Sequence, residues 1–262
     1  MKNLNPNRIK SNVTVFLEVF NEEERIESCL KSFSWADELI VYDKQSTDRT
    51  WEIAKKYATK LVSVPYSQAS ENIVKNISGV DSCEWCFFIT ASSLIHPEIV
   101  KEIIKLTNTL SFSYDVIAIP YAIYAFGIRS ERSPWTNSRK CSLIRKSALK
   151  VSSELHNEIG YSSNRIFEMP SIGEAEGLYN CTHKNASDFF SRHMRYVDYE
   201  AKYMLNKPND RQLKKSFIDI FRAFGGVILI MVGDFTQLGP ILSEEEEKSN
   251  IRFVFQSITT FR

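Results

Sequence analysis

The chain has 262 residues, enough for one large domain or for one domain with an appendage. Lys and Arg total 33 while Asp and Glu total 32, so the chain lacks the basic excess of a nucleic-acid-binding protein and we expect chemistry on a small molecule instead. Residues 1–12 have no apolar core of the kind a signal peptide needs, so we expect a cytoplasmic protein with reduced cysteines.

Residues 13–57 predict two strand–turn–helix units in succession. Two short apolar runs end in polar turns at 21–24 and 43–48, and apolar residues at helical spacing follow each turn. Ser46, Thr47 and Asp48 are residue types that cap the start of a helix. Strands that alternate with helices pair in parallel, and ligands of such sheets bind at the carboxyl ends of the strands. Both polar turns are therefore expected at the ligand edge of a mostly parallel α/β sheet flanked by helices.

Weaker patterns predict further elements along the chain. Strands are expected at 61–64, 85–89 and 116–119, and helices at 73–77, from Pro97 onward and at 186–204.

The polar turns resemble those of a known family. Asn21-Glu22-Glu23, Trp35-Ala36-Asp37-Glu38 and Asp43-Lys44-Gln45-Ser46-Thr47-Asp48-Arg49-Thr50 stand where inverting family 2 glycosyltransferases, in particular the bacterial lipopolysaccharide-core type, have N-E-E, W-A-D-E and D-S-G-S-T-D-x-T. The resemblance implies a GT-A-type α/β domain over residues 1–205 and a C-terminal helical extension over 206–262. It also implies transfer of a hexose, with inversion, from a nucleotide-sugar donor, foremost a UDP-sugar, to a surface-glycan or lipid-linked acceptor. The residues that it places around the nucleoside are Val19, Asn21, Glu22 and Asp43.

The chain departs from the family pattern at two places that face the donor. The family's basic residue followed by Asn is here Glu71-Asn72, which retains the Asn and replaces the cation by an acid. The family's D-A-D-E, whose carboxylates hold a divalent metal, is here Thr90-Ala91-Ser92-Ser93, with Ser92 in the place of a metal-binding acid. Hydroxyl groups are poor ligands for Mn²⁺ or Mg²⁺, so a tightly bound metal is disfavoured. The alternative to an active transferase is a catalytically inactive relative that binds a glycan or a partner enzyme.

Later segments supply candidates for the chemistry. The stretch from Leu155 to Glu158 resembles the family's valine-histidine-glutamate turn, which makes Glu158 the first candidate for the general base, with Glu154 and His156 behind it. His183, which stands where the family has a histidine at the end of a short strand, is a candidate to neutralise the donor diphosphate in place of a metal. Arg139 and Arg145 are further candidate cations for the diphosphate. A structural loop histidine is the alternative for His156 and for His183.

The C-terminal extension is basic and then apolar over residues 213–242. Its stretch without polar side chains, 224–232, is shorter than the about 20 residues that cross a bilayer. Two interpretations remain open. One is an interfacial helix pair at the inner membrane surface with Lys214, Lys215 and Arg222 at the headgroups, and the other is packing against the catalytic domain or against a second subunit in a homodimer.

Overall fold

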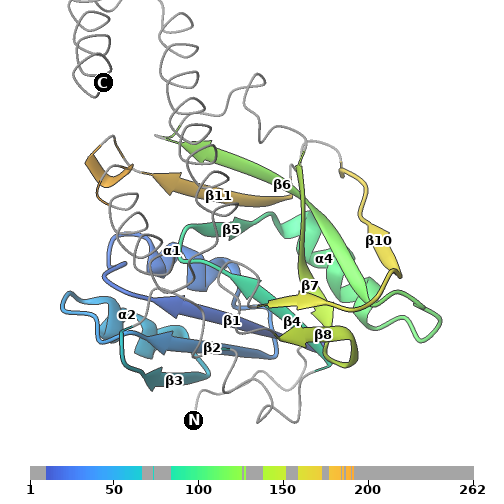
Figure 1. Ribbon diagram of the computed structural model, residues 1–262, viewed down its shortest axis with the longest axis horizontal. Helices are drawn as coiled ribbons and strands as arrows, with labels where there is room; N and C mark the ends of the chain where they lie inside the picture. The colour runs from blue at the N-terminus through green and yellow to red at the C-terminus, as the bar shows by residue number, and fades with distance from the viewer. Residues whose placement is uncertain are drawn as a thin grey trace, which may run out of the picture. The chain divides into compact units, whose positions relative to one another are not determined.

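A mixed sheet forms the centre of the computed structural model (Figure 1). The structure describes residues 10–66, 73, 84–125, 127, 138–151, 159–172, 177–183, 185, 187–189 and 191. Within these residues the sheet has nine strands in the order β3-β2-β1-β4-β7-β6-β11-β5, with β10 paired to β6. The candidates Asn72, His156 and Glu158 lie outside the described residues, as does the extension from 206 onward.

The strands and helices follow the predicted alternation in the first half of the chain. The strands of the sheet are β1 (Val13–Val19), β2 (Glu38–Asp43), β3 (Lys60–Ser63), β4 (Trp85–Ile89), β5 (Ser93–Ile95), β6 (Val116–Ala125), β7 (Ser138–Arg145), β10 (Ile166–Glu168) and β11 (Leu178–His183). The helices are α1 (Ile26–Ser32), α2 (Thr50–Tyr57) and α4 (Pro97–Thr107), and a 3-10 turn (Lys146–Ala148) leads into the hairpin β8 (Leu149–Val151) and β9 (Ile159–Tyr161). The expected α/β fold class is confirmed.

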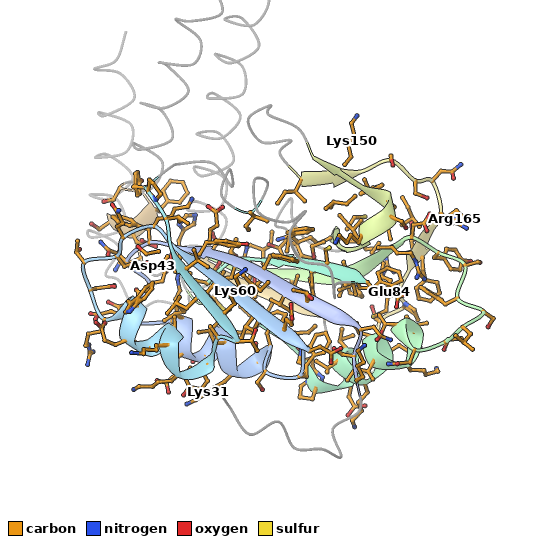
Figure 2. The ribbon with its side chains drawn as sticks, turned by 90° about the horizontal axis from the view of Figure 1, so that it is seen from below. Lys31, Asp43, Lys60, Glu84, Lys150 and Arg165 are labelled. Atoms are coloured by element: carbon orange, nitrogen blue, oxygen red, sulfur yellow. The ribbon has the colours of Figure 1, made fainter. Side chains whose placement is uncertain are left out.

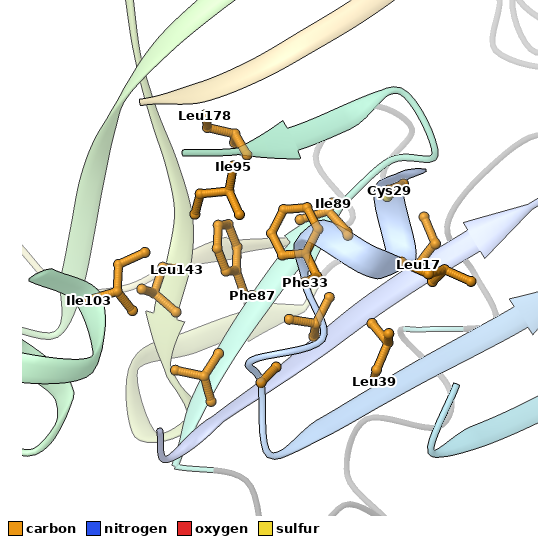
Figure 3. Packing of buried hydrophobic residues seen from close by; sticks show 14 of the residues in the cluster. Leu17, Cys29, Phe33, Leu39, Phe87, Ile89, Ile95, Ile103, Leu143 and Leu178 are labelled. Carbon is orange, nitrogen blue, oxygen red and sulfur yellow. The ribbon is translucent and has the colours of Figure 1, made fainter. Parts of the chain in front are cut away.

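The core lies on both faces of the sheet. Figure 2 shows α1, α2 and α4 along one face, and Figure 3 shows apolar side chains such as Leu17, Phe33 and Phe87 packed on that side. Because neighbouring residues of a strand point to opposite faces, Phe16 belongs to a second cluster on the other face, where Leu149 of β8 packs. Burial on both faces explains why β1 and β2 are nearly continuous apolar runs.

Parallel pairing brings the polar turns to one edge of the sheet, as expected. Val19 at the end of β1 lies opposite Asp43 at the end of β2, and Leu17 lies opposite Ile89 at the end of β4. The turns that follow these three strands therefore meet at the same edge. Beyond β4 the sheet becomes mixed, because β7 pairs antiparallel with both β4 and β6.

Two local expectations are corrected. Strand β6 continues through Pro120 to Ala125 instead of ending at residue 119, and its pairing with β7 shifts register between Ile117 and Ile119. Helix α2 takes Arg49, not Ser46 to Asp48, as its cap residue. The Asp48 carboxylate still accepts a hydrogen bond of 2.9 Å from the Thr50 backbone N–H in the first turn.

No helix among the described residues is long and apolar enough to cross a membrane. Cys29, Cys86, Cys141 and Cys181 are free thiols in the part of the chain that the structure describes.

Gly177, just before β11, is a position that we expect to tolerate no side chain. Its φ is +112°, and a Cβ there would lie 2.0 Å from the carbonyl oxygen of Pro120. The variant Gly177→Ala should lose about 2–4 kcal/mol of unfolding free energy, because the backbone is strained and both clashing groups are held by the sheet. The matched variant Gly160→Ala, where the nearest atom would be 4.0 Å away, should lose less than about 1 kcal/mol. Urea unfolding of both variants measures the difference, and equal losses would contradict this account of β11.

Candidate functional site

The turns after β1 and β2 are joined by side chains of one turn that bind the backbone of the other. The Asn21 N–H donates to Ser46 Oγ at 3.0 Å, and the Thr47 N–H donates to Asn21 Oδ1 at 2.8 Å. The Glu22 N–H donates to Thr50 Oγ1 at 2.7 Å. These bonds satisfy N–H groups that no strand partner reaches, so the two turns behave as one unit.

Both turns use a left-handed backbone conformation at a residue other than glycine. Asn21 has a φ of 54° and Gln45 has a φ of 61°. Asn adopts this region readily, but Gln does so at a cost of about 1–3 kcal/mol. The hydrogen bonds of the neighbouring residues hold the strained backbone in place, which keeps the edge of the sheet in one conformation.

Asp43 closes its own turn from the end of β2. Its side chain is 2% exposed and accepts hydrogen bonds from Ser46, at 2.5 Å from the hydroxyl and at 3.1 Å from the N–H. A carboxylate has about four acceptor positions, so these bonds leave capacity for a ligand. Val19 and Asn21 lie beside it, and the structure therefore brings together three of the four residues expected around the nucleoside.

The fourth, Glu22, is engaged by an arginine that the sequence analysis did not single out. Arg25 binds both carboxylate oxygens of Glu22, one of them through NH2 at 3.0 Å. Its NH1 donates to the carbonyl oxygens of Cys181 at 3.2 Å and Thr182 at 3.1 Å, so that it ties the start of α1 to the end of β11. The spacing of three residues between Glu22 and Arg25 could have predicted their ion pair from the sequence. The contact of Arg25 with β11 could not have been predicted in this way, because it depends on tertiary structure.

The turn at residues 90–93 is a network of hydroxyl groups. Thr90 Oγ1 lies 2.9 Å from Ser92 Oγ and 3.1 Å from Ser93 Oγ. The Cys181 N–H donates to the Ser92 carbonyl oxygen at 2.9 Å, so β11 also holds this turn. Ser92 thus lies at the same edge as Asp43, although its neighbours are hydroxyl groups instead of carboxylates.

The side-chain oxygen atoms of this turn are poor ligands for a divalent cation. Mn²⁺ and Mg²⁺ prefer charged oxygen ligands, whereas Thr90, Ser92 and Ser93 offer neutral hydroxyls that bind one another. Across the part of the chain that the structure describes, no group of three or more His, Cys, Asp or Glu residues is arranged to hold a metal ion.

His183 lies at the end of β11, two residues beyond the N–H that binds Ser92. Its ring packs edge-to-face against Phe189 with 4.8 Å between ring centres, and its Nδ1 is 3.8 Å from an oxygen of Asp188. The side chain is 12% exposed. These contacts hold the imidazole at the end of β11.

The two candidate arginines of β7 lie at different ends of the sheet. Arg139 begins the strand near the ligand edge, but its guanidinium donates to the Met169 carbonyl oxygen and lies 3.6 Å from Glu168. Arg145 lies opposite Trp85, the first residue of β4, and pairs with Glu84 at 2.5 Å. Figure 2 shows Glu84 at the end of the sheet opposite Asp43. The expectation that Arg145 neutralises a diphosphate is therefore corrected, because β7 runs antiparallel to β4 and carries its last residue away from the site.

Comparison with known proteins gives a family match for part of the chain. Residues 14–105 match the family model described as glycosyl transferase family 2. No curated protein matches the chain. The matched segment contains β1, β2, β4 and the turns described above.

The fold is also similar to solved structures. One is residues 1–349 of TarS from S. aureus, with 18% identity over 64% of this chain and 60% of that chain and a TM-score of 0.47. The same fragment in complex with UDP-GlcNAc matches with 18% identity over 66% of this chain and 58% of that chain and a TM-score of 0.45. Glucosyl-3-phosphoglycerate synthase from Mycobacterium tuberculosis, in complex with Mn²⁺, UDP and glucosyl-3-phosphoglycerate, matches with 25% identity over 46% of this chain and 45% of that chain, with a TM-score of 0.34. The chain therefore spans less than two thirds of each of these structures.

A buried ion pair lies under the joined turns. Lys44 Nζ is 2.6 Å from Glu18 Oε2, and the two side chains are 11% and 6% exposed. The other oxygen of Glu18 accepts a hydrogen bond of 2.9 Å from the Ile73 N–H. Each charge depends on the other, because little water reaches either group.

We expect Lys44→Met to reduce the unfolding free energy by about 3 kcal/mol, because it leaves the Glu18 carboxylate buried without its cation. The double variant Lys44→Met with Glu18→Gln should recover more than half of this loss, since it removes both charges. Lys101→Met, which breaks an ion pair whose side chains are 72% and 47% exposed, is the control and should cost less than about 0.5 kcal/mol. Urea unfolding provides the measurement. A double variant as unstable as the single one would show that the pair is not the source of the effect.

Proposed function

We propose that this protein is a glycosyltransferase that moves a hexose from a nucleotide-sugar donor, foremost a UDP-sugar, to a surface-glycan or lipid-linked acceptor with inversion. The observation that carries the proposal is the junction of the turns after β1 and β2, which lies at the carboxyl edge of the sheet inside the segment that matches glycosyl transferase family 2. That edge is where open α/β sheets bind their ligands.

In this proposal the nucleoside contacts Val19, Asn21 and Asp43. The free acceptor positions of the Asp43 carboxylate bind N–H or hydroxyl groups of the base or ribose, and the contacts of Asp43 with Ser46 hold it in position. Glu22 does not contact the nucleoside directly in this proposal, because its carboxylate is paired with Arg25. Asn72 belongs to the proposed nucleotide site on the family resemblance alone.

The proposed reaction is a single displacement at the anomeric carbon. A general base, for which Glu158 is the first candidate with Glu154 and His156 behind it, takes the proton of the acceptor hydroxyl as that oxygen attacks from the face opposite the diphosphate. The bond to the diphosphate breaks and leaves a nucleoside diphosphate whose charge must be neutralised. We assign this task to side chains, with His183 and Arg139 as the candidates, because the hydroxyl groups at residues 90–93 do not fit a tightly bound metal.

A second function is favoured by that same turn. A catalytically inactive relative that binds a glycan or a partner enzyme would need neither metal-binding carboxylates nor a base, and Glu22 is already engaged within the protein. The two functions are distinguished by measuring whether the protein binds a nucleotide sugar and whether it then releases the nucleotide.

The chain divides into two parts in this proposal. Residues 1–205 form the transferase domain of a cytoplasmic protein. Residues 206–262 attach it to the inner membrane surface or join two subunits, and binding to anionic liposomes tests the first of these roles.

The direct test of the proposed function is calorimetric titration with UDP, GDP and CDP sugars, together with an assay for nucleotide release. We expect UDP-sugar binding and slow UDP release, both unchanged by excess chelator, because no step depends on a metal held at residues 90–93. Binding without any release would favour the inactive relative. Activity that chelator abolishes and Mn²⁺ restores would contradict this account of the turn.

Asp43→Asn tests the nucleoside site. Loss of a charge-assisted hydrogen bond should weaken UDP binding by about 1–3 kcal/mol. Glu84→Gln, which neutralises a carboxylate 48% exposed at the opposite end of the sheet, is the matched control and should bind UDP as the unmodified protein does. Equal affinities for both variants would remove Asp43 from the site. Thermal unfolding of both shows whether a lost affinity reflects a lost fold.

A further inference from the structure

In the second half of the sheet, a lysine and an asparagine contact the same tyrosine from the two strands that flank it. Lys140 Nζ of β7 lies 5.2 Å from the centre of the Tyr121 ring of β6. The Asn180 side chain of β11 donates a hydrogen bond of 2.5 Å from Nδ2 to the Tyr121 hydroxyl. The sequence analysis singled out Arg139 and Arg145 on this strand and passed over the lysine between them.

The charge of Lys140 is poorly compensated. The side chain is half-buried, and burial lowers the pKa of its ammonium group. No carboxylate of the described residues forms an ion pair with it, whereas Arg139 has Glu168 and Arg145 has Glu84. A single aromatic ring offsets only part of the cost of removing an ammonium group from water. An anion that binds beside Lys140 would supply the missing partner.

Asn180 offers a second polar group beside the same tyrosine. Its Oδ1 is buried, and among the described residues it has no hydrogen-bond partner. Buried polar atoms in proteins are nearly always bonded, so an acceptor left without a donor indicates a ligand or water that completes it. A hydroxyl group is a donor of suitable size.

The cluster adjoins the turn at residues 90–93. Asn180 lies opposite Ser93 where β11 pairs with β5, and the next residue, Cys181, binds the Ser92 carbonyl oxygen. Strand β7 runs antiparallel to β4, so its beginning, with Lys140, lies toward the end of β4 that carries this turn. In Figure 1 β11 passes between β5 and β6. Lys140 on β7 is therefore separated from Asp43 on β2 by β1 and β4 in the order of the sheet.

We propose that Lys140, Tyr121 and Asn180 form a binding site for the phosphoryl group of a hydroxylated ligand. The Lys140 ammonium group pairs with the phosphoryl oxygens, Asn180 Oδ1 accepts a hydrogen bond from a hydroxyl of the same ligand, and Tyr121 positions both side chains. The inference rests on the proposed function for the source of the phosphoryl group, which is either the diphosphate of the donor or a phosphate ester on the acceptor. It gives a cationic group to a site whose turn at residues 90–93 has no carboxylates to hold a metal.

The test compares Lys140→Met with Lys150→Met. Lys150 is exposed on β8, and Figure 2 shows its side chain extending away from the sheet, so the control removes the same charge without touching the cluster. Calorimetry measures the binding of UDP, and then of glycerol 3-phosphate to the protein saturated with UDP. We expect Lys140→Met to weaken one of these by at least about tenfold, the usual effect of losing a hydrogen bond to a charged group, and Lys150→Met to change neither.

The two arms identify the source of the phosphoryl group. Weaker UDP binding assigns Lys140 to the donor diphosphate, and weaker glycerol 3-phosphate binding with intact UDP binding assigns it to a phosphorylated acceptor. Asn180→Asp, a nearly isosteric change that places a carboxylate at the Tyr121 hydroxyl, should weaken binding of the same ligand, and it serves as the test if Lys140→Met does not fold.

Failure of this site can be told apart from failure of the proposed function. If Lys140→Met binds both ligands as the unmodified protein does, or if the unmodified protein binds neither, the site is refuted. Tight phosphate binding through Lys140 without any release of nucleotide from a UDP-sugar would refute the transferase and leave the site standing.

Discussion

The edge of this sheet depends on hydrogen bonds between two turns that are some 25 residues apart in the chain. Parallel pairing of β1 and β2 brings the turns together, and the side chains of Asn21 and Ser46 then bind backbone N–H groups that would otherwise lack partners. The left-handed backbone at Asn21 and Gln45 persists because these bonds hold it. The same polar residues therefore serve the fold and lie beside Asp43 at the carboxyl edge of the sheet.

Strand β11 connects this edge to the second half of the sheet. Arg25 reaches two of its carbonyl oxygens, the Cys181 N–H holds the turn at residues 90–93, and Asn180 lies opposite Ser93. One strand thus contacts the start of α1, the turn and β6. A change that displaces β11 would also displace the start of α1, the turn at residues 90–93 and β6, because protein interiors are closely packed and transmit displacement.

The positive charges near the ligand edge differ in how they are compensated. Lys44 has Glu18, Arg25 has Glu22 and Arg139 has Glu168, so much of their charge is balanced within the protein. Lys140 faces an aromatic ring instead. A site without carboxylates for a metal needs a cation whose charge is still available to a phosphoryl group, and this difference separates Lys140 from the arginines on either side of it.

The sequence by itself determined the first half of the fold and the position of its polar turns. Apolar periodicity and polar breaks predicted β1, α1, β2, α2 and β4 to within a few residues, because these elements depend mainly on local pattern. The tertiary structure alone decided which cations lie near the ligand edge. The direction of β7 carries Arg145 to the far end of the sheet, and the register shift within the β6–β7 pair accompanies the placement of Lys140 over Tyr121. Strand direction and register are set by pairing between distant segments, and a pattern read along one segment does not contain them.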